Sequence, residues 1–352
     1  MNRHILLTAL LLATGSGLLS GLLSGCAANS PKAASQTQTT ASGRQPDWVT
    51  QPPRQPGMAY GVGSMEIYGD PADALKRASE LARVDLVSQL KVTVSGDFSS
   101  TTTETSGSGQ TSQVQRNVSN YVRSQVPPVE MDEIVISDSW AGEKYAYALA
   151  ELDRAKAAAH LRRDIQDVEQ QIHDIAALQP QGTRLQQLQP LLPALKLFAR
   201  RERLSERLQL VSMDRHGAPM SAELRALQNR IYDQISQLQV AVQLTDSGAE
   251  VIGGGVMEAL TEQGLKIQQG GSYDLLFSVS ANLSNKAKDG NQYVFADSRI
   301  TISDANGRVL SSFSKQAKGV SGLAEVARYK ASRAVAGLIG DELAVTLVDK
   351  IR

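Results

Sequence analysis

The sequence has a single cysteine, Cys26, among its 352 residues. No disulfide can form within the chain, so its stability must come from packing. Basic and acidic residues are balanced at 36 each, and this balance gives no reason to expect nucleic acid as a partner. After the N-terminal segment, no stretch reaches the roughly 18 uninterrupted apolar residues of a membrane-spanning helix.

Histidines are also scarce. Those that follow the N-terminal segment are His160, His173 and His216, and none has a second histidine or a cysteine at the spacing of metal ligands. A metal site built on His160 and His173 would need carboxylates that converge from elsewhere. We interpret these two as solvated residues of a helix, and we expect no metal site.

Two short motifs resemble parts of catalytic or binding sequences, but the motifs that normally accompany them are missing from this chain. Residues 312–315 read Ser-Phe-Ser-Lys, but the Ser-Asp-Asn and Lys-Thr-Gly motifs of penicillin-recognising enzymes are missing, so we treat the match as chance. Residues 253–255 are three glycines with no Lys-Ser or Lys-Thr after them, so they form no phosphate loop. We expect them to allow close packing; contact with a partner is the alternative. We therefore predict no catalytic residue, no cofactor and no enzymatic activity.

The N-terminus has the pattern of a secretory signal, with Arg3 and His4 before an apolar stretch over 5–23. Its ending, Leu23-Ser24-Gly25-Cys26, resembles the bacterial lipobox. This resemblance implies that the signal covers residues 1–25 and that the Cys26 thiol receives diacylglycerol. The mature chain would then begin at a lipidated residue, with acyl chains such as palmitate as its membrane anchor. The alternative is an ordinary signal that happens to contain a cysteine.

Residues 26–46 are rich in Ser, Thr, Ala and Gln and predict a flexible tether, because they offer little apolar surface to bury. A tether of about 20 residues has a root-mean-square reach of about 25 Å. Ala27 stands where an Asp would signal retention in the inner membrane in enterobacteria-like sorting. We therefore expect an outer-membrane anchor that faces the periplasm.

Residues 47–152 predict a first α+β domain. An apolar strand over 59–64 is followed by Asp70-Pro71, a favourable helix start. Apolar residues then recur at helical spacing to about Lys91.

The rest of this domain predicts strands. Val92 and Val94 would open one strand, residues 96–112 would form a polar hairpin tip, and residues 114–126 would form the return strand. Further strands are expected at 133–140 and 143–152. This order indicates a helix packed on an antiparallel sheet.

Four segments of this domain carry a family resemblance. They are Pro46-Asp47-Trp48-Val49, Tyr60-Gly61-Val62-Gly63-Ser64, Ala82-Arg83-Val84-Asp85-Leu86 and Tyr145-Ala146-Tyr147-Ala148-Leu149. In this order they resemble the LPP-twenty outer-membrane lipoprotein family, which includes FlgP-like flagellar lipoproteins, over residues 46–155. The resemblance implies a non-enzymatic lipoprotein and carries over no catalytic residue.

Residues 153–238 predict a helical insert, either a hairpin or a small three-helix bundle. Apolar residues at 161, 165, 168, 172 and 175 follow a heptad pattern, and similar steps recur at 185–211 and 224–238. We expect these helices to pack on one another. The alternative is an exposed seam that binds a partner or a second copy of the chain.

The insert also has an arginine-rich stretch over 200–207, with Arg200, Arg201, Arg203 and Arg207 interleaved with glutamates. We interpret it as a solvated face with internal charge compensation, the alternative being a surface for anionic lipid or acidic wall polymers. Trp48 and Trp140 belong to strand-rich segments, and we expect them in the core instead of on a ligand-stacking surface.

Residues 239–352 predict a second α/β domain. A strand over 240–244 and a helix over 247–263 lead to alternating strands, which flank a polar loop at 286–291 and a turn at Asp304-Ala305-Asn306-Gly307. A long helix from about Leu323 ends the pattern. Its β-α-β-β-β-β-α order loosely resembles the modules of peptidoglycan-synthase activator lipoproteins and the N-terminal domain of TolB.

Together these patterns predict an α+β chain with two helix-on-antiparallel-sheet domains separated by the helical insert. We expect a non-catalytic outer-membrane lipoprotein that acts as a periplasmic scaffold or adaptor in an envelope assembly, with a flagellar assembly as one case. Its partners would be membrane lipid through Cys26, envelope proteins and a second copy of itself. The alternative is a regulatory lipoprotein that activates a peptidoglycan-synthesising enzyme.

Overall fold

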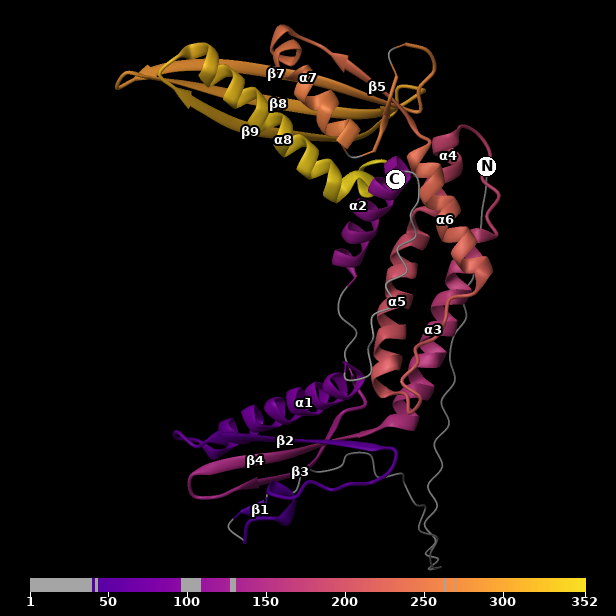
Figure 1. Cartoon of the computed structure of the whole chain (residues 1–352), viewed down its shortest axis with the longest axis vertical. Helices are drawn as coiled ribbons and strands as arrows, with labels where there is room; N and C mark the ends of the chain where they lie inside the picture. The colour runs from indigo at the N-terminus through magenta and orange to yellow at the C-terminus, as the bar shows by residue number, and fades with distance from the viewer. Residues whose placement is uncertain (1–39, 42–43, 96–108, 127–130, 263, 269) are drawn as a thin grey trace, which may run out of the picture. The chain divides into compact units, whose positions relative to one another are not determined.

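The computed structural model describes residues 40–41, 44–95, 109–126, 131–262, 264–268 and 270–352. The described residues belong to a single unit, in which the helices α3, α5 and α6 lie between two sheets (Figure 1). Helices pack on largely antiparallel sheets, which confirms the expected α+β class. Within the described residues, no helix is both long and apolar enough to cross a membrane.

The first sheet lies in the N-terminal part of the described chain. Its strands are β1 (Thr40–Ala41), β2 (Met58–Glu66), β3 (Val135–Ala141) and β4 (Tyr145–Asp153), in the order β1-β3-β4-β2. β4 pairs antiparallel with both β2 and β3, whereas β1 lies parallel to β3. The last three strands form where the sequence predicts them. A short 3-10 turn, η1 (Asp47–Val49), precedes β2.

One helix, α1 (Pro71–Ser95), packs on this sheet, as predicted. It comes very close to β2 because the facing positions are small. A Cβ added to Gly61 would lie 2.4 Å from the Ala82 carbonyl oxygen, and one added to Gly63 would lie 2.1 Å from the Ala78 carbonyl oxygen. Only glycine on the strand, opposite alanine on the helix, permits this approach.

The predicted strand pair after α1 is wrong. α1 continues through Val92 and Val94 to Ser95, and α2 spans Gly109–Gln125, so the expected return strand is helical. The prediction followed the β-propensity of valine. However, the buried residues of α2 recur at helical steps; they are Val118, Tyr121 and Val122. Residues 96–108 of the predicted hairpin tip lie outside the described residues. α2 contacts α5, α6 and α8.

The helical region follows β4 directly. It contains α3 (Arg154–Ala176), α4 (Arg184–Leu188), the 3-10 turn η2 (Gln189–Leu191), α5 (Pro193–Val211) and α6 (Ala222–Ser236). The Asp153 side chain caps α3 by accepting from the Lys156 N–H. Thr183 and Gln186 form a capping box at the start of α4.

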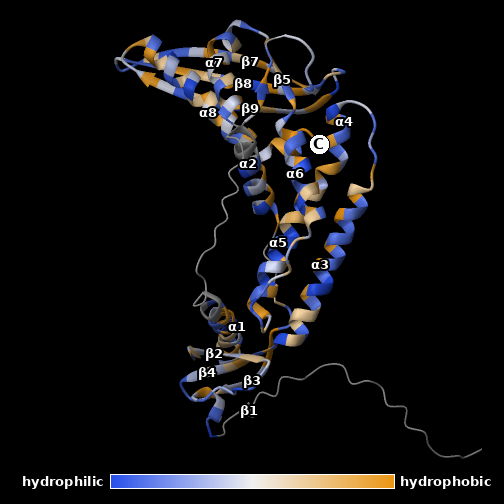
Figure 2. Ribbon diagram, turned by 45° about the vertical axis from the view of Figure 1, so that its right-hand side comes forward, coloured by the Kyte–Doolittle hydropathy of each residue, from blue (hydrophilic) through white to orange (hydrophobic). Residues whose placement is uncertain are grey.

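The apolar seam of these helices faces inward. α3 packs on α5, and α5 contacts α6, so the helices cover one another. Buried seam residues include Leu161, Ile165, Val168, Ile172, Leu195, Leu204, Leu208, Leu224, Ile231 and Ile235. Figure 2 shows the resulting change between apolar and polar positions along α3, α5 and α6. Of the two arrangements considered for the seam, the structure has the self-packed one.

The second sheet lies in the C-terminal part. Its elements are β5 (Gln239–Leu244), α7 (Ser247–Glu262), β6 (Lys266–Ile267), β7 (Leu275–Lys288), β8 (Asn291–Asp304), β9 (Val309–Ser321) and α8 (Ala324–Lys350). The strand order is β6-β5-β7-β8-β9. β5 is parallel to β6 and β7, and the remaining pairs are antiparallel. α7 and α8 pack on this sheet.

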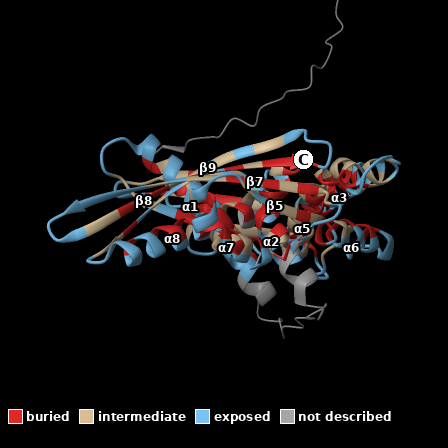
Figure 3. Cartoon of the chain, turned by 90° about the horizontal axis from the view of Figure 1, so that it is seen from above, coloured by how far each residue is buried: buried red, intermediate tan, exposed pale blue. Residues whose placement is uncertain are grey.

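The predicted polar loop over 286–291 is shorter than expected. β7 runs to Lys288 and β8 begins at Asn291, so only Asp289 and Gly290 form the turn, with φ values of 51° and 74°. Two residues with positive φ are typical of a type I′ hairpin turn. The polar residues are in strands because this hairpin end is exposed on both faces (Figure 3). The turn predicted at 304–307 is confirmed, since the Gly307 N–H donates to the Asp304 carbonyl at 3.0 Å.

Buried apolar side chains from both sheets and from the helical region belong to one connected cluster, which runs from Ala74 to Ile351. The described parts of the chain from α1 onward therefore share a core instead of forming separate cores. This matters for function because neither sheet is attached by a bare linker.

Candidate functional site

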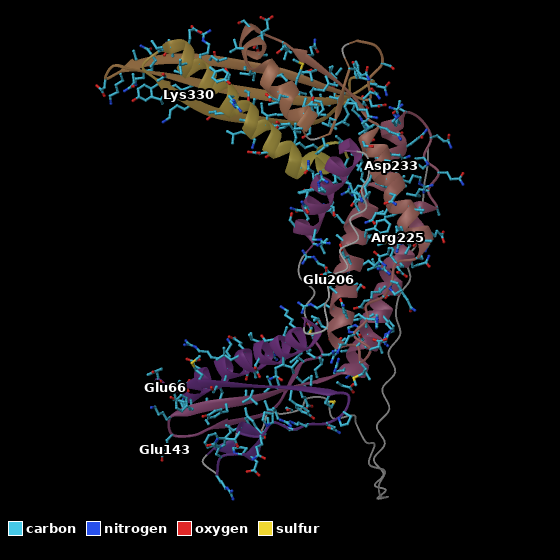
Figure 4. All side chains as sticks on the ribbon, in the orientation of Figure 1. Glu66, Glu143, Glu206, Arg225, Asp233 and Lys330 are labelled. Atoms are coloured by element: carbon cyan, nitrogen blue, oxygen red, sulfur yellow. The ribbon has the colours of Figure 1, made fainter. Side chains whose placement is uncertain are left out.

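In the first sheet, the outer edge of β2 has no neighbouring strand among the described residues, which makes it a candidate interaction site. β2 pairs with β4 on one side only and is last in the strand order. In an antiparallel pair, alternate residues direct their backbone groups away from the partner. The backbone groups of Val62 point away from β4, and those of Tyr60 and Ser64, two residues to either side, have the same orientation. β2 is nine residues long, and Glu66 at its end is its charged residue (Figure 4). Such a long and nearly uncharged edge is suited to strand pairing.

Asp85 of α1 modifies this edge. Its carboxylate accepts a hydrogen bond from the Val62 N–H at 2.9 Å and another from Gln89 Nε2 at 2.8 Å. Both Asp85 and Val62 lie in the segments that carry the family resemblance. The sequence indicated a helix and a strand here but not this bond between them.

A set of polar clamps joins the helical region to its neighbours. Arg154, at the start of α3, donates to the carbonyls of Val211 and Ser212 at the end of α5, at 2.9 and 2.7 Å. Arg184 donates to the Gln237 carbonyl at 2.8 Å and to Asp274 at 3.0 Å. These clamps use charged donors on backbone carbonyls and, for Arg184, also on the Asp274 carboxylate, and hydrogen bonds with a charged donor are among the stronger ones.

The end of α8 is held by a second set of contacts. Gln189 Nε2 donates to the Ile351 carbonyl at 2.8 Å, and Lys196 lies 3.3 Å from the Asp349 carboxylate. Tyr121 of α2 also donates to Asp349. Burial, followed by this hydrogen bond, raises the pKa of Tyr121 to about 12. The phenol therefore stays a neutral donor at physiological pH.

Glu342 of α8 is the centre of a charge cluster that sequence reasoning missed. Its carboxylate lies 3.0 Å from Lys315 of β9 and 3.0 Å from Lys350. The hydrogen bonds from Lys315 and Lys350 lower the pKa of Glu342 to about 2. Lys350 also lies over the Phe313 ring, 4.4 Å from its centroid. Because β9 and α8 meet only in the fold, no local pattern could indicate this cluster.

The Lys315 contact also explains the Ser-x-x-Lys match. Residues 312–315 lie in β9, and the lysine is paired with Glu342. The three glycines lie in α7, as expected for close packing. A Cβ on Gly253 would lie 2.6 Å from the Leu244 side chain, and one on Gly255 would lie 2.8 Å from Ala336 Cβ.

His160 and His173 lie on α3 with 45% and 41% of their side chains exposed, as expected for solvated helix residues, but both also have acidic neighbours. His160 contacts Glu133 through Nδ1, and its Nε2 lies 3.5 Å from Asp164. The hydrogen bond with Glu133 is the main cause that raises the pKa of His160 above its ordinary value. His173 lies 3.9 Å from Glu223. Among the described residues, no group of three or more His, Cys, Asp or Glu is placed to hold a metal ion.

The interpretation of the arginine-rich stretch as a solvated face is wrong for Arg201. This side chain is only 3% exposed; it pairs with Glu169 at 2.7 Å and donates to the carbonyls of Ala218 and Pro219. Its guanidinium thus joins α3 to the loop between α5 and α6. Arg200 is exposed, as expected.

Trp48 and Trp140 are half-buried, so the expectation that they belong to the core is wrong. Trp140 pairs in register with Tyr147, and their ring centroids are 5.8 Å apart. The neighbouring Ala146 and Ala148 are fully buried toward α1, so Trp140 lies on the opposite face of the sheet. Trp48 donates to Asp138 at 2.7 Å.

The lipidation site, Cys26 with Leu23, Ser24 and Gly25, lies outside the described residues, and its lipidation stays a prediction. Most of the predicted tether over 26–46 is also outside them. Thr40 and Ala41, however, form β1, which pairs with Trp140 and Ala141. These two residues of the tether are thus assigned to the first sheet.

Comparison with solved structures gave matches of low identity. A minor lipoprotein from Acinetobacter baumannii matches with 10% identity over 31% of this chain and 92% of its own, at a TM-score of 0.28. The secreted protein HP1454 from Helicobacter pylori matches with 18% identity over 81% of this chain and 98% of its own, at 0.42. Lipoprotein GNA1162 from Neisseria meningitidis matches with 12% identity over 31% of this chain and 95% of its own, at a TM-score of 0.22.

A comparison with curated proteins gave no match. The family model named LPP20 lipoprotein matches residues 46–153. This range contains β2, β3, β4, α1 and α2, together with the Asp85–Val62 bond. It confirms the family resemblance that the sequence motifs indicated. Over residues 46–153, the chain is therefore similar to the LPP20 lipoprotein family.

Proposed function

We propose that this protein is a lipid-anchored scaffold or adaptor in a cell-envelope assembly, without catalytic activity of its own. Cys26 would hold it in the outer membrane, and the described residues would face the periplasm. Support comes first from the match of residues 46–153 to a lipoprotein family. A flagellar assembly is the case that the family resemblance favours.

The observation that carries the proposal is the connection between the parts. One hydrophobic cluster joins both sheets through the helical region, and clamps such as Arg154 and Arg184 fix the ends of its helices. A binding partner held by the first sheet is then fixed relative to whatever the second sheet holds. This is the mechanical property that a scaffold needs, and a shared, close-packed core provides it.

The free edge of β2 is where we place the contact with a partner. A partner strand would add to the sheet by backbone hydrogen bonds. Val62 is already bonded to Asp85, so Tyr60 and Ser64 would supply the outward groups. The partner proposed is an envelope protein with an exposed strand, either a ring component or a peptidoglycan synthase.

Crosslinking in intact cells, followed by affinity capture of the lipoprotein and mass spectrometry, tests this proposal. Ser64→Pro removes an outward N–H while keeping the bonds to β4, because proline is tolerated at such edge positions. Ser64→Thr is the matched control, since it keeps the N–H. We expect the wild type and Ser64→Thr to recover the same envelope protein, and Ser64→Pro to recover about tenfold less.

The identity of the captured protein separates the two functions. A ring component supports the scaffold, and a wall-synthesising enzyme supports the activator. Recovery of the uncrosslinked monomer alone contradicts both. Equal recovery by Ser64→Pro and Ser64→Thr contradicts the role of the β2 edge.

A further inference from the structure

A groove of about 680 Å3 runs along α1 on the side away from the first sheet. Ala82 and Leu86 are fully buried on the sheet side, whereas Val84 is 61% exposed on the groove side. The segment that leads into β3 forms a second wall with Met131. α5, which contacts α1, adds a third element (Figure 1).

Three cationic side chains from two helices line this groove. Arg83 and Lys91 come from α1, and Arg207 comes from α5. No described residue forms an ion pair or a side-chain hydrogen bond with any of them. Asp132 is the acidic residue among the described lining, which leaves two positive charges in excess. A concave surface with such an excess attracts an anion.

Several other arginines nearby do have a partner among the described residues. Arg201 is paired with Glu169, and Arg123 of α2 is paired with Glu202. Arg203 donates to the Arg123 carbonyl. Arg207, where α5 borders the groove, has no such contact with a described residue, and its half-buried side chain contributes to the groove lining.

The groove also offers apolar surface between the cations. Val84 and Val87 lie between Arg83 and Lys91 along α1, and Met131 faces them from the other wall. A free phosphate would use the charges and leave this surface in water. A ligand that combines an anionic group with a hydrocarbon chain would use both, and the volume is in the range of small-molecule sites.

We propose that this groove binds an anionic phospholipid. Its phosphate would lie between Arg83, Lys91 and Arg207, and the first part of an acyl chain would cover Val84 and Met131. The inference does not rest on the proposed scaffold function. It gives the chain a second lipid contact, independent of Cys26.

Binding can be measured on the chain without residues 1–26, because the hydrophobic core runs from Ala74 to Ile351. Isothermal titration calorimetry would use short-chain phosphatidylglycerol below its micelle concentration. Glycerol phosphate tests the anionic group alone, and short-chain phosphatidylcholine tests the same chains with a zwitterionic head. We expect both comparison ligands to bind at least about tenfold more weakly than phosphatidylglycerol.

The double variant Arg83→Gln with Arg207→Gln should weaken binding of phosphatidylglycerol by about a hundredfold, since two charge-assisted contacts are lost. Lys76→Gln with Arg77→Gln is the matched control, because both residues are exposed on α1 outside the groove. This control makes the same change in net charge and should bind as the wild type does. Val84→Ser should weaken binding of the lipid but leave that of glycerol phosphate unchanged.

Three results would overturn the proposal. The first is equal weakening by the groove variant and the control variant, which would indicate nonspecific attraction. The second is equal affinity for phosphatidylglycerol and glycerol phosphate, which would make the groove a simple anion site. The third is tighter binding of an oligoglutamate peptide than of the lipid, which would assign the groove to an acidic protein segment.

Discussion

The carboxylate of Asp85 on α1 accepts a hydrogen bond from the backbone N–H of Val62 on the edge strand β2. The bond joins the helix to the sheet at a position where the strand has no partner strand. It also occupies one of the outward backbone groups that a docking strand would use. The same contact thus stabilises the domain and limits how its edge can pair.

Replacing Asp85 with Ala should destabilise the chain by about 1–2 kcal/mol, because the Val62 N–H loses a charged acceptor. Urea unfolding followed by circular dichroism would measure the change. Glu80→Ala on the exposed side of the same helix is the control and should change stability by less than about 0.5 kcal/mol. Equal effects of the two variants would show that the bond contributes nothing specific.

Gly63→Ala should destabilise the first domain by about 3 kcal/mol, because the new methyl group would overlap the Ala78 carbonyl. Gly254→Ala provides the opposite case. Nothing lies within 4 Å of a Cβ at Gly254, which is exposed in α7. Alanine there should stabilise by about 0.5–1 kcal/mol. Thermal unfolding of both variants checks the prediction, and a neutral Gly63→Ala would contradict the close contact of α1 with β2.

Arg201→Ala should lower the free energy of unfolding by about 3 kcal/mol or more, since it leaves Glu169 and the Ala218 and Pro219 carbonyls without their donor. Arg200→Ala removes the same charge from an exposed neighbour and should have little effect. Denaturant midpoints of the two variants give the comparison. Similar midpoints would restore the interpretation of this stretch as a solvated face.

Glu342 predicts how stability depends on pH. Its pKa falls from 4.5 to about 2 on folding, so its contribution is present above pH 4.5 and is lost as the pH falls toward 2. Glu342→Gln should therefore cost about 1–3 kcal/mol at pH 7 and almost nothing near pH 2. Asp341→Asn, at the exposed neighbouring position, should show no such dependence. A pH-independent cost for Glu342→Gln would contradict the charge pairing with Lys315 and Lys350.

Cys26→Ala should abolish lipidation, because it removes the thiol that would carry the acyl chains. Cells fed radiolabelled palmitate would show label on the wild-type protein and none on the variant. The variant should also leave the membrane fraction, since no lipid would remain to anchor it. Continued labelling of the variant would place the lipid on another residue, and absence of label from the wild type would contradict lipidation.

Much of the fold was predictable because its elements follow local rules. The heptad spacing that includes Leu161 and Ile165 predicted a self-packed helical region, and the alternation around Phe277 predicted β7. α2 was mispredicted because the β-propensity of valine was given more weight than the helical spacing of Val118 and Val122. The contacts of the candidate site were harder to predict from the sequence. The buried Arg201, for example, lies in the same sequence pattern as its exposed neighbours.

Local sequence patterns were sufficient to specify the α+β class and most of the helices and strands, whereas the family and the candidate lipid site at Cys26 were indicated by resemblance to known motifs. They are sufficient because periodicity, capping and turn chemistry act over a few residues. Only the tertiary structure could bring Asp85 to Val62, Glu342 to Lys315, and Arg207 to the groove on α1. Such contacts join residues far apart in the chain, and the shared core that places them results from packing of the whole chain.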